Sequence, residues 1–237
     1  MTARATSLLV TTVLLLGWSA SAVRVDQSSI YQGCIGSPST CRSLNLDNDQ
    51  LTGSMPTELG KLTSLTHMQI SRNHLTGTLP TEMAALTSLR DIQLHENTLT
   101  GTLATELAAL TNLNDLYLWK NRLTGTIPSE LAILSALTYM SLSDNQLTGT
   151  LPSELGAMTD FIALGAMNNR LTGTLPTELG ALTIITRLTM CGNKLQGTMP
   201  TELSLLTRLS ILCVEISRNL FGHGCVHVVL GGAYLED

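Results

Sequence analysis

The sequence predicts an α/β repeat solenoid, a right-handed superhelix with a parallel β-sheet on its concave side and turns or short 3-10 helices on its convex side. Two observations lead to this fold class. A unit of 24 residues recurs through seven copies without a slip between residues 44 and 209. Within each copy an L-x-L segment, such as Leu116-Tyr117-Leu118, alternates apolar and variable residues as a short strand does. One coil cannot bury its own leucines, so the coils must stack and their strands must pair about 4.8 Å apart.

An asparagine follows the strand in nearly every unit. The column consists of Asn73, Asn97, Asn121, Asn145, Asn169 and Asn193, with Asp49 in the first copy. A carboxamide both donates and accepts hydrogen bonds. We therefore expect each of these side chains to satisfy backbone groups in its own coil and in the next one.

The segment L-T-G-T-[LIM]-P-[TS]-E then turns the chain toward the back of the coil. Its glycine permits a sharp turn, and its proline removes a donor where regular strand pairing stops. One glutamate per copy, from Glu58 to Glu202, is expected to form a solvated outer ridge.

The amino-terminal region has the features of a secretory signal peptide over residues 1–22. Arg4 provides the positive start, an apolar stretch follows, and Ala20-Ser21-Ala22 matches a cleavage site. An uncleaved membrane anchor is the alternative, although the apolar stretch is shorter than the ~20 residues of a span. We expect a secreted chain with a cap over 23–43, the repeats over 44–209, and a divergent last repeat with a cap over 210–237.

The five cysteines fit an oxidising compartment. Cys34 and Cys41 lie just before the first repeat and are expected to form one disulfide. A second disulfide, Cys213–Cys225, is expected at the other end and would leave Cys191 free. Cys191–Cys213 is a competing pair, because one sequence does not determine connectivity.

The charge balance excludes one class of partner. The net charge is −5, and charged residues make up only 13% of the chain, whereas hydrophobic residues make up 43%. A nucleic-acid-binding protein needs a basic face to displace counterions from phosphates, so we expect no nucleic-acid partner. No segment after the signal peptide is long and apolar enough for a membrane span.

The repeats resemble the plant-type extracellular leucine-rich repeats, whose unit reads roughly L-x-x-L-x-x-L-x-L-x-x-N-x-L-T-G-x-I-P-x-x-L-G-x-L. The likeness covers residues 44–209 and extends to the spacing of Cys34 and Cys41, although the tryptophan usually found between those cysteines is missing. After Leu209 the pattern departs from the family and returns two residues late, from Val214 to Gly222. The resemblance to receptor-like protein ectodomains and polygalacturonase inhibitors implies recognition of a ligand on the concave sheet and no catalysis.

The variable residues beside the strand leucines should form the exposed concave face. The second to fifth copies carry the most distinctive set, namely His67, Gln69, Arg72, Asp91, Gln93, His95, Asp115, Tyr117, Trp119, Lys120, Tyr139 and Ser141. Tyr117, Trp119 and Tyr139 should cluster there as anchors for a protein partner or platforms for sugar rings. The alternative is that these rings only cover neighbouring strands.

The same face shows no convincing catalytic or metal-binding pattern. His67 and His95 lie in different columns and lack ligands at metal spacing. Asp91 and Asp115 share a column on adjacent strands, close enough for the pKa of one to rise, but no nucleophile accompanies them. We expect no enzyme activity, no metal and no cofactor.

The leading functional hypothesis is therefore a secreted module that binds an extracellular protein, peptide or carbohydrate, as a receptor-like protein in signalling or defence. One alternative is an inhibitor of a secreted polysaccharide-degrading enzyme. Another is binding to ice or a polysaccharide through threonine pairs around the turn glycines, such as Thr124 and Thr126, which would form a regular lattice. A third is a shortened receptor gene product without a role of its own.

Overall fold

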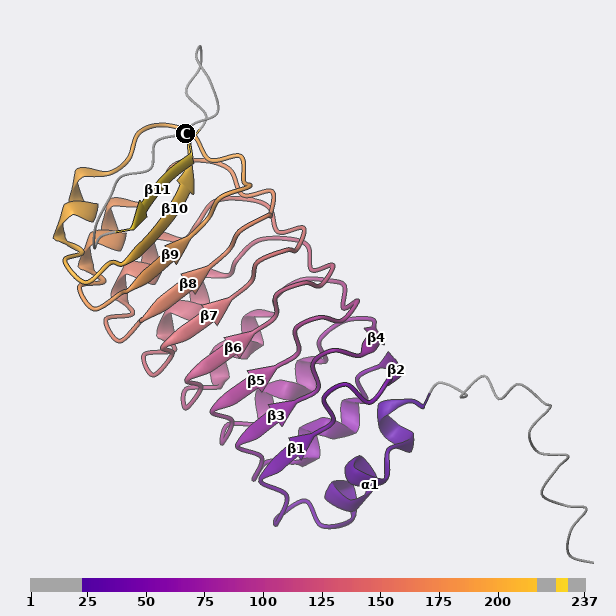
Figure 1. The fold of residues 1–237 in the computed structure, drawn as a ribbon. Coiled ribbons are helices and arrows are strands. Elements are labelled where there is room, and N and C mark those ends of the chain that lie inside the picture. Colours follow the sequence, from indigo (N-terminus) through magenta and orange to yellow (C-terminus); the bar gives the residue numbers. More distant parts are fainter. Residues whose placement is uncertain (1–22, 217–224, 230–237) are drawn as a thin grey trace, which may run out of the picture.

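The structure, a computed structural model, describes residues 23–216 and 225–229 as a curved stack of coils (Figure 1). The expected signal peptide, residues 1–22, lies outside the described residues, and so does most of the expected carboxyl-terminal cap. The main sheet contains nine strands in the order β1-β3-β5-β6-β7-β8-β9-β10-β11. Its strands are β1 (Ser43–Asn45), β3 (His67–Gln69), β5 (Asp91–Gln93), β6 (Asp115–Tyr117), β7 (Tyr139–Ser141), β8 (Ala163–Gly165), β9 (Arg187–Thr189), β10 (Ile211–Glu215) and β11 (Cys225–Val229).

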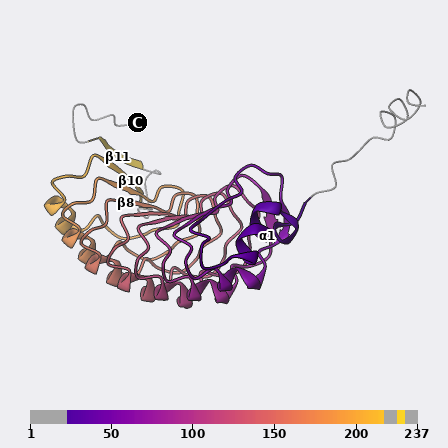
Figure 2. The same cartoon turned by 90° about the horizontal axis from the view of Figure 1, so that it is seen from below.

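The predicted parallel sheet is confirmed from β1 through β10, because each strand pairs in parallel with the strand one repeat later. Each coil then crosses to the convex side through a short 3-10 helix. These helices are η2 (Thr57–Lys61), η3 (Thr81–Ala85), η4 (Thr105–Ala109), η5 (Ser129–Ile133), η6 (Ser153–Ala157), η7 (Thr177–Ala181) and η8 (Thr201–Leu205). Figure 2 shows them along the outer edge of the curve, with the strands on the inner side.

The amino-terminal end is closed by η1 (Val25–Gln27) and the helix α1 (Ser29–Gly36), which Figure 1 places beside the first coil. Val25 and Tyr31 bury their side chains against the first leucines. The expected disulfide between Cys34 and Cys41 is present, with a Cα–Cα distance of 5.1 Å, and it ties the end of α1 to the segment before β1.

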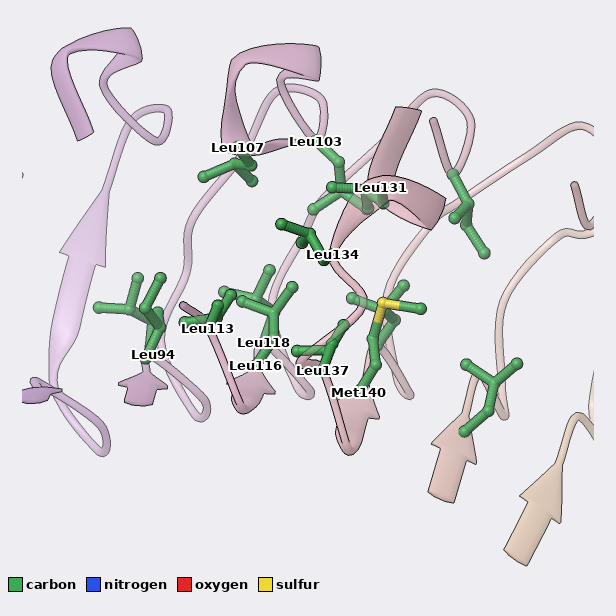
Figure 3. Close-up of a cluster of buried hydrophobic side chains, with 14 of the residues drawn as sticks. Leu94, Leu103, Leu107, Leu113, Leu116, Leu118, Leu131, Leu134, Leu137 and Met140 are labelled. Atoms are coloured by element: carbon green, nitrogen blue, oxygen red, sulfur yellow. The ribbon is translucent and has the colours of Figure 1, made fainter. Parts of the chain in front are cut away.

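Leucines from successive coils fill the space between sheet and helices. Figure 3 shows one part of this core, where Leu116 and Leu118 from the β6 segment face Leu107 and Leu131 from the convex side. All four side chains are buried. The stack is held by this continuous apolar spine, since no single coil encloses its own leucines.

The asparagine column makes the hydrogen bonds expected of it, with one correction. Asn121 Oδ1 accepts from the backbone N–H of Leu99, and Asn121 Nδ2 donates to the carbonyl oxygens of Leu94 and Leu118. The bonds between coils therefore reach the preceding coil and not the next one. The reason is geometric: the buried asparagine lies below the turn of the coil before it, where backbone groups lack partners.

Two expectations about the carboxyl-terminal end are wrong. Cys213 forms a disulfide with Cys191, not with Cys225, because Cys191 and Cys213 lie on adjacent coils with Cα atoms 5.4 Å apart. The strand register also shows no slip through Val214, since Leu212 pairs in register with Leu188 and both Leu212 and Val214 are buried, while the rest of the expected shifted motif, from residue 217 on, lies outside the described residues. The strand β10 is longer than its predecessors, and β11 pairs with it in the antiparallel direction.

The side of each coil between strand and helix carries a second backbone ladder. The strands β2 (Thr52–Ser54) and β4 (His74–Thr76) form a two-stranded parallel sheet there. The ladder continues along the stack, for example from Thr124 N–H to the Gly101 carbonyl at 2.7 Å and from Thr148 N–H to the Gly125 carbonyl at 2.7 Å. This flank is therefore as regular as the concave sheet.

Among residues 23–216 and 225–229, the helices are all too short or too polar to cross a lipid bilayer.

Candidate binding site on the concave sheet

The concave face places the sequence-predicted site residues in rows that run across the strands. The strand register aligns His67, Asp91, Asp115 and Tyr139 in one row. It aligns Gln69, Gln93, Tyr117 and Ser141 in a second row. Arg72, His95, Trp119 and Lys120 follow the carboxyl ends of these strands, so most of the predicted residues share one surface over β3, β5, β6 and β7.

Two carboxylates lie side by side in the first row. Asp91 is directly paired in register with Asp115. Contrary to expectation, Asp91 is not exposed but only 7% accessible. Two amides account for its burial, because Gln69 Nε2 donates to Asp91 Oδ2 at 3.3 Å and Gln93 Nε2 donates to both oxygens at 3.2 and 3.0 Å. The 24-residue period predicts the position of Asp91 in the row. Its burial depends on the conformations of the Gln69 and Gln93 side chains, which the period does not predict.

The pKa of Asp115 is raised, as expected for one member of such a pair. Burial is the main cause, the charge of Asp91 adds to it, and a hydrogen bond with the side chain of Thr138 opposes it. Burial and the same two carboxylates also raise the pKa of Tyr117, whose hydroxyl therefore stays protonated at neutral pH. Tyr139 stands in the next coil beside Asp115 and is 38% exposed.

Trp119 is part of a stack and not a free ring. Its ring lies 4.4 Å from the His95 ring, centroid to centroid, with an interplanar angle of 12°. The ammonium of Lys120 lies 5.0 Å from the Trp119 ring centroid. Burial lowers the pKa of His95, so the imidazole is neutral at neutral pH. Trp119 thus partly covers the neighbouring coil, as the alternative interpretation held, and it remains half-buried at the surface.

A chain of charges runs beside this stack. Glu96 accepts from Arg72 Nε at 3.3 Å and lies 3.9 Å from Lys120 Nζ. These three residues occupy the same turn position in successive coils, with left-handed φ values of 55°, 54° and 53°. The turn directs each long side chain toward its neighbour one coil away, so the two cations are already partnered within the protein.

The face changes character beyond β7. Ala163 and Gly165 on β8 continue the two rows of β7, and neither carries a side chain that projects far from the sheet. Arg187 follows in the first row on β9 and is exposed. The sequence analysis did not single out Arg187, although its place 24 residues after Ala163 in the repeat assigns it to this row.

The concave face of the described residues has no grouping of side chains suited to a metal ion. Within the described part of the chain no three His, Cys, Asp or Glu side chains come together as a metal site. Asp91, the most enclosed carboxylate, is held by amides. The arrangement offers charge, rings and hydrogen-bonding groups for recognition.

Comparison with known proteins identifies the repeat. A family model described as Leucine Rich Repeat matches residues 64–86, 112–134 and 136–158. The chain is a leucine-rich-repeat protein. A search of curated protein sequences finds no match.

The leucine-rich repeats are of the plant extracellular type, as the resemblance indicated. The ectodomain of the receptor kinase GASSHO1/SCHENGEN3 from Arabidopsis thaliana, solved with CASPARIAN STRIP INTEGRITY FACTOR 2, is 36% identical with a TM-score of 0.73, over 73% of this chain and 21% of that one. The Arabidopsis receptor kinase HAESA, solved with the peptide hormone IDA and the co-receptor SERK1, is 30% identical with a TM-score of 0.72, over 73% of this chain and 29% of that one. A plant ice-binding protein is 30% identical with a TM-score of 0.64, over 72% of this chain and 54% of that one. The chain therefore spans only part of the length of each of these three proteins.

The flank of the leucine-rich repeats carries the threonine pairs. In three coils the threonine before the turn glycine bonds inside the protein, since the hydroxyls of Thr124, Thr148 and Thr172 donate to glycine carbonyls of the preceding coil at 3.2 Å. The threonines after the glycines are exposed in six successive coils, at Thr78, Thr102, Thr126, Thr150, Thr174 and Thr198. An open depression of about 670 Å³ borders this column beside η5. One hydroxyl of each pair thus remains available to a surface ligand.

Proposed function

We propose that the chain is a secreted recognition module that binds a protein or peptide ligand on its concave face, as a receptor-like protein in signalling or defence. The observation that carries the proposal is the surface over β5, β6 and β7, where carboxylates, tyrosines and the His95–Trp119 stack lie on one rigid sheet. Two similar plant ectodomains were solved with peptide hormones or a named protein factor, which supports a ligand of this class. A rigid sheet holds such a surface in place, so little order is lost when a ligand binds.

The proposal includes the absence of catalysis. Asp91 and Asp115 are the closest approach to an acid–base pair on this face, and no nucleophile accompanies them. Disulfides at both ends of the stack agree with an extracellular location.

Removal of two rings from this face tests the proposal. The double variant Tyr117→Ala with Trp119→Ala is expected to weaken capture of partners from the extracellular medium more than about 30-fold, because central aromatic anchors contribute 2 kcal/mol or more to binding. Ile133→Ala with Leu205→Ala is the matched control, since it removes two large apolar side chains that are 64% and 58% exposed on the convex helices.

Equal capture by the wild type and the Tyr117/Trp119 variant would refute the concave site. Mass spectrometry of the captured proteins separates a signalling partner from a secreted polysaccharide-degrading enzyme, which the inhibitor alternative requires.

Binding to ice or a crystalline polysaccharide is a second candidate. The exposed threonine column and the likeness to a plant ice-binding protein favour it. Thermal hysteresis of the purified protein is the measurement. Thermal hysteresis should fall in the double variant Thr126→Lys with Thr150→Lys. It should not fall in the control variant Thr81→Lys with Thr177→Lys, whose substitutions lie on the convex helices. Lack of thermal hysteresis in the wild type would remove ice as the ligand.

A further inference from the structure

Within the part of the chain that the structure describes, Asp91 and Asp115 of the concave face form no ion pair. Arg24 forms an ion pair with Asp26, and Glu96 forms ion pairs with Arg72 and Lys120, so none of these cations reaches Asp91 or Asp115. Asp91 is held by the neutral amides of Gln69 and Gln93, and Asp115 by the Thr138 hydroxyl. A charge that is buried without a counter-charge is unfavourable, so this part of the surface is suited to a cation from outside the chain.

The basic groups around the carboxylates do not supply that cation. Arg72 and Lys120 are engaged by Glu96. His95 is kept neutral by burial. His67 is exposed and has its Nδ1 atom 2.9 Å from the Thr66 hydroxyl. Arg187 lies three strands beyond Asp115 in the same row and forms no ion pair with it.

Tyrosine rings provide the second feature of a cation site. Tyr139 is in register with Asp115 on the next strand, and Tyr117 lies within electrostatic reach of Asp91, Asp115 and Tyr139, with the cation of Arg187 as a smaller, opposing influence. The raised pKa of Tyr117 keeps its phenol neutral. Cations are attracted to the faces of such rings, most strongly where water is partly excluded. Carboxylates and rings therefore favour the same sign of ligand charge.

We infer that Asp115, Tyr117 and Tyr139, beside the buried negative charge of Asp91, form an acid–tyrosine site that receives a cationic group of a peptide ligand, namely a Lys or Arg side chain or a free amino terminus. The inference rests on the proposed concave-face function and names the chemistry of its ligand. Ala163 and Gly165 on the adjacent strand β8 present no long side chain, so an extended backbone has room to lie across the strands beside the site. A bound cation would also offset the unfavourable charge of Asp115.

The test is selection from a random library of linear decapeptides, prepared once with free and once with acetylated amino termini, using the purified full chain. Lys or Arg is expected to be enriched about tenfold at one position of the selected peptides, in line with the lower end of the couplings measured for close charge pairs across an interface. Enrichment confined to the free-terminus library identifies the amino group as the cation. The variant Asp115→Asn should abolish the preference, and Asp115→Lys should replace it with a preference for Asp or Glu.

Glu154→Gln is the matched control, because it removes one negative charge from the convex helix η6. It should leave the selected sequences unchanged. The reversal by Asp115→Lys cannot arise from misfolding, which would abolish selection altogether.

Three results would overturn the inference. Selected peptides without a basic preference, or with one that survives Asp115→Asn, would refute the acid–tyrosine site while leaving concave-face binding intact. Retention of neutral cellohexaose that depends on Asp115 would show that the site binds a sugar and needs no counter-charge. A wild-type chain that selects no peptide would refute the inference, whereas the proposed function is tested separately by the capture experiment with Tyr117→Ala and Trp119→Ala.

Discussion

At the scale of single residues, the buried asparagine of each coil is the polar group on which the stack most depends. Asn121 is 8% exposed and serves three backbone groups in two coils. Asn121→Ala leaves these groups buried without partners, so the free energy of unfolding should fall by about 3 kcal/mol. Urea denaturation measures the change.

Asn112→Ala is the control for that substitution. Asn112 is exposed, and its Nδ2 atom donates one bond to the Thr87 carbonyl at 2.9 Å. Its loss should change stability by no more than about 0.5 kcal/mol. Similar losses at Asn112 and Asn121 would contradict the role assigned to the buried column.

Whereas Asn121 stabilises the fold, the ionised side chain of Asp115 destabilises it. Its pKa in the folded chain lies above the ordinary 3.8, so the folded state holds the proton more tightly than the unfolded state does. Stability therefore declines as the pH rises from about 3.8 through the folded pKa. Asp115→Asn removes the ionisable group and should raise the melting temperature at pH 7.

That increase should vanish at pH 3, where Asp115 is protonated in both states. Asp160→Asn, which changes an exposed carboxylate, should have no effect at either pH. If the wild-type chain had a higher melting temperature than the Asp115→Asn variant at pH 7, the carboxylate would stabilise the fold and the prediction would be wrong.

The residues of the site show how far sequence reasoning extends. The 24-residue period places Asp91, Asp115 and Tyr139 in one row because strand register repeats with the coil. It does not predict that two glutamine amides bury Asp91 or that His95 stacks on Trp119. Those contacts depend on the rotamers of long side chains from neighbouring coils, which a periodic pattern does not specify.

At the scale of structural elements, the turn glycine and the threonine of the preceding coil form a close contact. Gly125 has φ of 76°, and a Cβ at this position would lie 2.7 Å from Thr102 Cγ2. Gly125→Ala should lower the free energy of unfolding by about 3 kcal/mol, since it adds left-handed strain to overpacking.

The substitution Thr102→Ser, which removes the contacting methyl group, separates the cost of overpacking from the cost of backbone strain. Combined with Gly125→Ala it should recover about 1 kcal/mol, because the overpacking is relieved while the backbone strain remains. The single Thr102→Ser variant provides the reference for this double-mutant cycle in urea denaturation. Additive effects of the two substitutions would show that the methyl contact carries no energy.

The elements were predictable from sequence wherever the repeat is regular. The seven strands from β1 to β9 in the main sheet, and the convex turns between them, follow from the columns of leucine, asparagine and glycine. The strand β10 shows where pattern reasoning fails. The later motif from Val214 suggested a shift, whereas Leu212 and Val214 already fill the leucine positions.

At the scale of the whole molecule, the described coils contact mainly their immediate neighbours, so the stack is quasi-one-dimensional. In such an array the interior coils are stabilised from both sides and the end coils from one side only. Helix α1 with Cys34–Cys41 protects one end. The antiparallel strand β11 and Cys191–Cys213 protect the other. The proposed binding surface over β5, β6 and β7 lies between these ends, in coils that have neighbours on both sides.

This arrangement predicts that loss of a disulfide has a local effect. Cys191→Ser with Cys213→Ser opens a link of 22 residues, which is worth about 3 kcal/mol in the unfolded-chain entropy model. Amide hydrogen exchange should accelerate in β9 and β10 but stay unchanged in β5 and β6. Cys34→Ser with Cys41→Ser is the mirror-image control and should expose β1 and β3 alone. If either pair of substitutions accelerates exchange equally in every strand, the coils unfold as one cooperative unit and the one-dimensional description fails.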